Sequence, residues 1–236
     1  MAASHARKPR RARQRLSPEE RESEIVRSAV AYFAEVGFEG STRDLAARIG
    51  ITQPLLYRYF PSKEALLDRV YQEVYLSRWD PQWDERLANR SVPLRQRLTA
   101  FYQDYSRVIL TYEWVRLFMF AGLKGLSFNA RYIAFLRKAL FRRVALELRA
   151  EYRQSQDAPV SDEEAELIWS LHAAIFYLGV RRWIYAMPMP PDLDADIALK
   201  VDAFLFGAPV ALWGERTEGA RSRGKLGAPK IVTAAT

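Results

Sequence analysis

The sequence predicts an all-α protein in which a small N-terminal domain precedes a larger helical domain. Three observations support this fold class. Apolar residues recur at the three- and four-residue spacing of amphipathic helices through most of the 236 residues. Residues that begin helices and glycines that end them fall at the edges of these patterns. Runs of alternating apolar and polar residues, which indicate strands, are missing from the sequence.

The first predicted helix has an unusually clear start. Ser17-Pro18-Glu19-Glu20 combines a hydroxyl N-cap, proline at the first helical position and glutamate at the third. The apolar stripe that follows ends at Gly37. Further along, Ser62-Lys63-Glu64 begins a longer helix, which we expect over residues 62–79.

Two short helices are predicted between these longer ones. Ser41-Thr42-Arg43-Asp44 is a second capping motif, and Gly50 ends the helix that it begins. Thr52 caps the next helix, which we expect to reach about Phe60. A short capped helix, a tight turn and a second short helix make a helix-turn-helix.

The rest of the chain is predicted to consist of long helices. Pro81 and Pro93 bracket an expected break after the helix of residues 62–79. Helical patterns follow at about 94–112, 113–124, 128–155, 162–187 and 194–213. The tail of residues 214–236 has little apolar periodicity, so we expect it to be disordered.

The net charge of +8 resides at the two ends of the chain. Residues 1–15 contain six basic residues and no acidic one, and residues 214–236 contain five basic and two acidic residues. The segment between them is therefore nearly neutral. We expect a basic, disordered arm over residues 1–16. It either attracts phosphates non-specifically or reaches the minor groove of DNA, or it is a solvated tail without a role.

Composition disfavours several classes of function. The absence of cysteine excludes disulfides, thiolate metal sites and a cysteine nucleophile. His5 and His172 alone leave little material for a zinc site or a histidine-based triad, and there is no glycine-rich phosphate loop. We therefore expect that the protein is not an enzyme and that it binds neither a metal nor a cofactor. The apolar run Leu171–Val180 is shorter than the roughly 20 residues of a membrane span, so we expect a cytoplasmic protein.

The second helix of a helix-turn-helix lies in the DNA major groove and reads base edges. Glutamine pairs with adenine, arginine pairs with guanine, and tyrosine hydroxyls suit phosphate oxygens. The outward face of this helix is expected to carry Thr52, Gln53, Tyr57, Arg58 and Tyr59. We interpret Leu45, Ala46, Ile49, Leu56 and Phe60 as core.

This region resembles the DNA-binding domain of the tetracycline-repressor (TetR) family of bacterial transcriptional regulators. The resemblance covers roughly residues 20–75, and several spaced motifs recur in order. They are Ala34 to Gly37, Ser41-Thr42-Arg43-Asp44-Leu45-Ala46, Gly50-Ile51-Thr52-Gln53-Pro54, Leu56-Tyr57-Arg58-Tyr59-Phe60 and Ser62-Lys63-Glu64-Ala65-Leu66.

The resemblance implies a role for each matching position. Thr42 and Arg43 contact the phosphate backbone or neighbouring bases. Gln53, Pro54 and Leu55 face bases, and Tyr57, Tyr59 and Lys63 bind phosphates. Arg58 departs from the aromatic residue often found at its position. Each residue also has a structural interpretation, in which Thr42 is only a cap and Tyr57 packs within the domain.

The resemblance also implies a homodimer whose last two long helices form a four-helix interface. An intramolecular core is the alternative role for the apolar residues of these helices. The candidate interface residues are Trp169, Ala173, Tyr177, Val180, Val201, Phe204, Leu205, Ala208 and Leu212.

The middle helices are rich in aromatic residues. They suggest an apolar cavity for an effector with a few polar groups, and plain core packing is the alternative. His172, on an apolar helix, is expected to be a satisfied core or interface histidine rather than a ligand group. The candidate effector residues are Tyr105, Trp114, Phe118, Phe128, Tyr132, His172 and Phe176.

Together these patterns predict a DNA-binding regulator, a repressor, that binds a palindromic operator as a dimer and is released by a small apolar or aromatic effector. Residues 17–61 would form the helix-turn-helix domain, residues 62–79 the linking helix, and residues 80–213 the effector-binding and dimerisation domain. The alternative is a sequence-tolerant, nucleoid-type protein that binds DNA through its basic tails and takes no effector.

Overall fold

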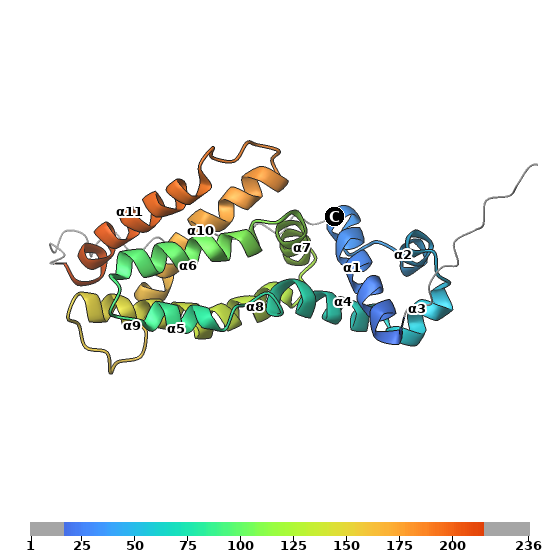
Figure 1. The fold of residues 1–236 in the computed structure, drawn as a ribbon, viewed down its shortest axis with the longest axis horizontal. Coiled ribbons are helices and arrows are strands. Elements are labelled where there is room, and N and C mark those ends of the chain that lie inside the picture. Colours follow the sequence, from blue (N-terminus) through green and yellow to red (C-terminus); the bar gives the residue numbers. More distant parts are fainter. Residues whose placement is uncertain (1–16, 215–236) are drawn as a thin grey trace, which may run out of the picture. The chain divides into compact units, whose positions relative to one another are not determined.

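The computed structural model describes residues 17–214, and within this range the chain forms helices and no strand (Figure 1). The all-α prediction is confirmed for these residues. The predictions made for the arm of residues 1–16 and for the tail beyond Gly214 lie outside the described residues.

The N-terminal helices begin where the capping signals predicted. Ser17 and Glu20 form the full capping box, with the Ser17 N–H donating to Glu20 Oε2 at 2.7 Å and the Glu20 N–H donating to Ser17 Oγ at 3.1 Å. Ser41, Thr52 and Ser62 each accept a backbone N–H bond at the start of the next three helices. These helices are α1 (Pro18–Val36), α2 (Thr42–Ile49), α3 (Gln53–Tyr59) and α4 (Lys63–Tyr71), which continues into a π-helical turn, η1 (Gln72–Leu76).

The later helices differ from the prediction at several boundaries. Residues 82–88 form a short helix where a break was expected, because Trp83 and Leu87 bury one face of it and Pro81 is compatible with a helix start. The expected helix 128–155 contains a π-helical turn and ends earlier. The elements are α5 (Gln82–Ala88), α6 (Leu94–Ile109), α7 (Tyr112–Leu123), α8 (Phe128–Leu136), η2 (Arg137–Phe141), α9 (Arg142–Glu151), α10 (Asp162–Trp183) and α11 (Leu193–Trp213).

The described chain divides into two compact units. Unit 1 comprises the described part of residues 1–80 together with residues 107–134 and 179–187. Unit 2 comprises residues 81–106, residues 135–178 and the described part of residues 188–236. Unit 1 therefore contains later segments of the chain as well as the helix-turn-helix.

In unit 1, helix α1 packs against α2, α4 and α7. Its residues Ile25, Ala29 and Phe33 have no exposed surface. The Arg116 guanidinium, on α7, donates from Nε to the Ala34 carbonyl at 2.5 Å and from Nη2 to the Glu35 carbonyl at 3.2 Å. Because the last carbonyls of a helix lack partners within the helix, this arginine caps the C-terminal end of α1 and holds it on α7.

In unit 2, a buried carboxylate gathers three guanidinium groups. Glu147, on α9, is 1% exposed. Its Oε2 lies 2.8 Å from Arg97 Nη1 and 3.1 Å from Arg90 Nε, and its Oε1 lies 3.7 Å from Arg143 Nη1. A buried charge requires such compensation, so this cluster joins the α5–α6 loop, α6 and α9.

Among residues 17–214, no helix is both long enough and apolar enough to cross a lipid bilayer.

Candidate nucleic-acid interface

The turn between α2 and α3 requires glycine. Gly50 has φ +75° and ψ 36°, a left-handed conformation that other residues adopt only with strain. Its N–H donates to the Ala47 carbonyl at 3.1 Å, and the Ile51 N–H donates to the Ala46 carbonyl at 3.0 Å. These two bonds close the end of α2. The Thr52 hydroxyl then accepts the Leu55 N–H at 3.3 Å and begins α3.

One side of this helix pair is apolar and buried. Each of the five residues predicted as core is at most 8% exposed, so the prediction is confirmed for Leu45, Ala46, Ile49, Leu56 and Phe60. Their burial leaves the polar face of α3 on the opposite side, available to a partner.

Two polar side chains of that face, Gln53 and Tyr57, are hydrogen-bonded to Thr42 of α2. Gln53 Nε2 donates to Thr42 Oγ1 at 2.9 Å, and Thr42 Oγ1 lies 3.0 Å from the Tyr57 hydroxyl. Thr42 is 7% exposed, whereas Tyr57 is 38% exposed. The Thr42 hydroxyl thus connects the first residue of α2 to two residues of α3. The Gln53 amide oxygen and its second N–H take no part in these bonds.

The other predicted contact residues surround this group. Arg43, Thr52, Pro54 and Arg58 are exposed, and Leu55 and Tyr59 are half-buried. Lys63, at the start of α4, is half-buried with its Nζ 5.9 Å from the centre of the Phe33 ring. The candidate residues therefore come from α2, α3, the turn between them and the start of α4.

This arrangement can present amide and guanidinium groups to base edges and several donors to phosphates. Residues 25–70, which include the whole of α2 and α3, match the sequence profile of bacterial regulatory proteins of the tetR family. Residues 25–70 therefore form a domain of the tetR family.

The similarity to curated relatives covers only about a third of this chain. The class A tetracycline repressor protein of Escherichia coli, from transposon 1721, is 36% identical over 92 residues, which are 36% of this chain and 42% of that protein. The class D tetracycline repressor protein of Escherichia coli is 34% identical over 94 residues, which are 36% of this chain and 43% of that protein. The match thus spans less than half the length of these relatives.

Solved structures share the fold over most of the chain. A TetR-like transcriptional regulator from Rhodococcus sp. RHA1 matches with a TM-score of 0.59 and 21% identity, covering 82% of this chain and 98% of that one. A TetR family transcriptional regulator from Pseudomonas syringae pv. tomato str. DC3000 matches with a TM-score of 0.54 and 21% identity, covering 81% and 97%. The shared fold therefore extends well beyond residues 25–70.

The candidate dimer residues divide into two groups. Val180, Val201, Phe204 and Ala208 are at most 8% exposed within the single chain, as the alternative of an intramolecular core requires. Trp169, Ala173, Leu205 and Leu212 are half-buried, and Tyr177 is 50% exposed. The sequence reasoning missed a second stripe on α11, where Leu199, Phe206 and Val210 are 66%, 87% and 69% exposed. Because α11 is apolar on both faces, periodicity did not distinguish the buried stripe from the exposed one.

The candidate effector residues are distributed over both units. Trp114, Phe118, Phe128 and Tyr132 pack with Tyr75 in unit 1, where Trp114 stacks on Phe118 with ring centres 5.0 Å apart. Tyr105 and His172 pack together in unit 2, with ring centres 5.6 Å apart, and Phe176 is half-buried in the same unit. In both units, most of these side chains are buried among other aromatic rings, as in a packed core.

His172 departs from the satisfied histidine expected from its apolar helix. Its side chain is buried among Tyr102, Tyr105, Phe141 and Trp169. Its Nδ1 has no hydrogen-bond partner among the described residues. Burial lowers the pKa of His172 to about 4, so the imidazole is neutral at neutral pH.

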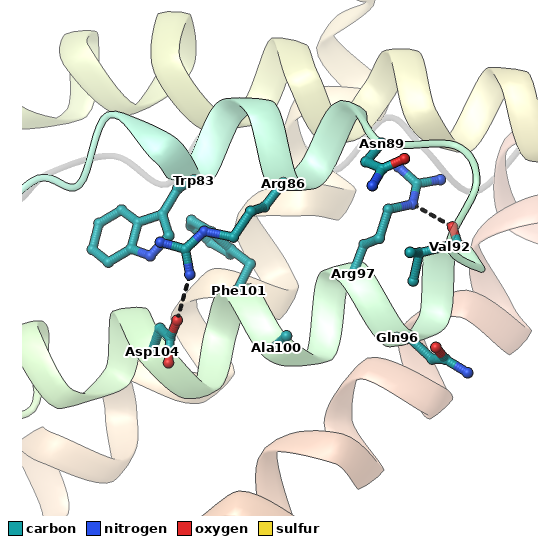
Figure 2. Close-up of a pocket in the computed structure, with 9 residues that line it drawn as sticks. All are labelled: Trp83, Arg86, Asn89, Val92, Gln96, Arg97, Ala100, Phe101 and Asp104. Carbon is teal, nitrogen blue, oxygen red and sulfur yellow. Dashed lines mark hydrogen bonds and ion pairs between the residues drawn. The ribbon is translucent and has the colours of Figure 1, made fainter.

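A cavity of about 330 Å³ lies between α5, α6 and the loop that joins them (Figure 2). Its lining includes Trp83, Phe101, Asn89 and Arg97, none of which was among the candidate effector residues. The signal in the sequence was weak, because α5 falls in the segment between Pro81 and Pro93 that was expected to lack a helix.

Proposed function

We propose that this protein is a transcriptional repressor that binds a roughly palindromic operator as a homodimer and is released by a small apolar or aromatic effector. The observation that carries this proposal is the Thr42–Gln53–Tyr57 group. It orders the polar face of α3 before any partner is bound, within a tetR-family domain.

In this proposal α3 enters the major groove, and Gln53, with its free amide oxygen and second N–H, reads adenine. Pro54 and Leu55 meet base edges, with Leu55 suited to a thymine methyl group. Thr52, Arg58 and Tyr59 border this surface on α3. Arg43 on α2, Lys63 at the start of α4 and the exposed Tyr57 side chain on α3 bind phosphates.

A dimer is needed because one seven-residue helix makes few base contacts. The exposed stripe of α11 supports it: Leu199, Ala203, Phe206 and Val210 follow one another at four-, three- and four-residue steps along one face. Tyr177 on α10 adds exposed aromatic surface. An apolar stripe of this kind is typical of a helix that packs against another protein surface. A second copy of the chain supplies that surface here.

Release by an effector follows from differential affinity. A ligand that favours one conformation of the dimer by about 1–3 kcal/mol changes DNA affinity about 5- to 150-fold. Helix α4 with η1 is the expected connection, since it follows the recognition helix directly in the chain.

The test is selection of genomic fragments by the full chain, followed by gel shifts with the selected duplex and a scrambled duplex of equal composition. A repressor with a defined operator binds the selected duplex at least a hundredfold more tightly at physiological salt. Equal binding of both duplexes would instead indicate the sequence-tolerant, nucleoid-type protein. Gln53→Ala is expected to relax the preference at one base position by about 1–3 kcal/mol, and Lys63→Ala to weaken all sites alike.

A further inference from the structure

The α5–α6 cavity has an apolar part and a polar part. Trp83 and Phe101, each 4% exposed, meet edge to face with ring centres 5.5 Å apart, and Ala100 and Val92 continue the apolar lining. A volume of about 330 Å³ is at the small end of the range for organic ligands. The apolar part therefore suits one aromatic ring system.

The polar part presents hydrogen-bond donors. Asn89 Oδ1 accepts the Ser91 N–H at 3.2 Å and the Ser91 hydroxyl at 2.7 Å. Because these two donors require the oxygen, they fix the amide orientation and leave the Asn89 NH₂ as the group free for a ligand. An acceptor on the ligand is needed to meet it.

Arg97 adds a second donor at the same end of the cavity. Its Nε donates to the Val92 carbonyl at 2.8 Å, and its Nη1 donates to the Leu87 carbonyl and to Glu147. Nη2 takes no part in these bonds. Figure 2 shows Asn89 and Arg97 at one end of the cavity and the Arg86–Asp104 pair beside Trp83 at the other.

The ion pairs in and beside the cavity join four arginines to three carboxylates. Arg86 pairs with Asp104 at 3.1 Å, and Arg143 pairs with Asp84 at 2.7 Å. Glu147 is then shared by Arg97 and Arg90. Within this set, the additional guanidinium belongs to the pair that includes Arg97, at the donor-rich end.

We propose that the α5–α6 cavity binds a small aromatic carboxylate, with its ring against Trp83 and Phe101 and its carboxylate on the Asn89 amide and the Arg97 guanidinium. The carboxylate supplies the acceptors and the negative charge that this end lacks, and charge-assisted bonds of this kind are the stronger ones. The assignment of this ligand as the effector rests on the proposed function, whereas its binding does not.

The experiment measures binding of 1-naphthoate and of its neutral analogue 1-naphthamide to the full chain by isothermal titration calorimetry. The acid is expected to bind at least tenfold more tightly than the amide. Asn89→Asp keeps the acceptor that Ser91 needs and replaces the NH₂ donor with a charged oxygen. This variant is expected to lose at least tenfold in acid affinity and to lose much less in affinity for the neutral amide, because only the acid is also repelled by the new charge. Gln82→Glu, which adds the same charge on α5 outside the cavity lining, is the matched control.

Ala100→Trp fills the cavity and is expected to abolish binding of both ligands, with the thermal unfolding midpoint reported for every variant. Equal affinity for acid and amide in the wild-type protein, or an unchanged acid affinity in Asn89→Asp, overturns the proposal, as does the absence of binding. Gel shifts with the selected duplex separate this result from the proposed function. Specific DNA binding without naphthoate binding removes only the cavity assignment, and naphthoate binding without specific DNA binding removes only the repressor.

Discussion

Thr42 and Gln53 lie on different helices, and the Gln53 side chain donates a 2.9 Å hydrogen bond from Nε2 to the Thr42 hydroxyl oxygen. The same oxygen is 3.0 Å from the Tyr57 hydroxyl. The family resemblance implies that Thr42 contacts a phosphate directly. Thr42 is only 7% exposed, however, which leaves little of its surface for such a contact. We propose that Thr42 acts as a positioning residue, which holds Gln53 and Tyr57 in place for DNA.

Replacing Thr42 with valine should weaken specific DNA binding while preserving the fold. Valine has nearly the same shape but removes both hydrogen bonds, each worth about 0.5–1.5 kcal/mol net. We expect about tenfold weaker binding to the selected duplex, measured by gel shift, and little change for a scrambled duplex. Thr42→Ser, which keeps the oxygen, should bind like wild type.

A double-mutant cycle distinguishes positioning from direct contact. If Thr42 acts through Gln53, the losses caused by Thr42→Val and Gln53→Ala are less than additive in the double variant. Fully additive losses would contradict the positioning role and favour an independent contact by Thr42.

The exposed stripe of α11 predicts that a single charge will separate the dimer. Phe206 is 87% exposed in one chain, so Phe206→Glu should not disturb the fold of that chain. At an interface the same carboxylate would be desolvated without a partner. We expect sedimentation velocity to show a shift from dimer to monomer at micromolar concentration.

Leu123→Glu is the matched control for that experiment, because Leu123 is 80% exposed and lies on α7, outside the α11 stripe in sequence and in the other unit. It should leave the dimer intact. An unchanged sedimentation coefficient for Phe206→Glu would place the interface elsewhere.

The helix-turn-helix was predictable because its signals are local. The caps Ser41 and Thr52, the left-handed Gly50 and the core residue Leu56 each act within a few residues of chain. The role of Thr42 was not predictable, since its bonds to Gln53 and Tyr57 span 11 and 15 positions in sequence.

The larger domain was predicted less well for a related reason. An apolar residue such as Val201 or Leu199 has the same pattern whether it faces its own chain or a partner, and only the packed structure separates 0% from 66% exposure. Likewise, the aromatic residues of the middle helices form two core clusters, and the cavity lies beside a short helix flanked by prolines.

Removing the buried charge of Glu147 is expected to lower the free energy of unfolding substantially. Glu147→Gln removes the negative charge that compensates Arg97, itself 7% exposed, together with Arg90 and Arg143. Breaking a buried ion pair by removing one partner typically costs about 3–5 kcal/mol. We expect a loss of that size in the free energy of unfolding, measured with urea at one fixed protein concentration.

Asp84→Asn provides the comparison, because Asp84 also pairs with Arg143 but its side chain is 49% exposed. Partly exposed pairs contribute about 0–1 kcal/mol, so this variant should be close to wild type. Similar losses for the two variants would show that burial of Glu147 does not set its energetic weight.

His172 predicts how stability depends on pH. Burial holds its pKa at about 4 in the folded protein, below the ordinary value of 6.5. Between these values the unfolded chain binds more protons at this residue, so folded stability falls as the pH falls from 6.5 toward 4. A shift of this size corresponds to about 3 kcal/mol, reached near pH 4 and absent above pH 7. Burial raises the pKa of Tyr102, which faces the imidazole, so this phenol stays protonated throughout this range.

His172→Phe should therefore flatten the acid side of the stability profile. Phenylalanine does not titrate, and it places a ring among Tyr105, Phe141 and Trp169 without leaving a buried nitrogen unpaired. Urea unfolding at pH 7.5 and pH 4.5 measures the effect, with His172→Gln as the polar control that also cannot titrate. Both variants should lose about 2–3 kcal/mol less than wild type between the two pH values. If the three profiles run parallel, the imidazole of wild type is protonated alike in the folded and unfolded states, and its burial is not what makes the protein acid-sensitive.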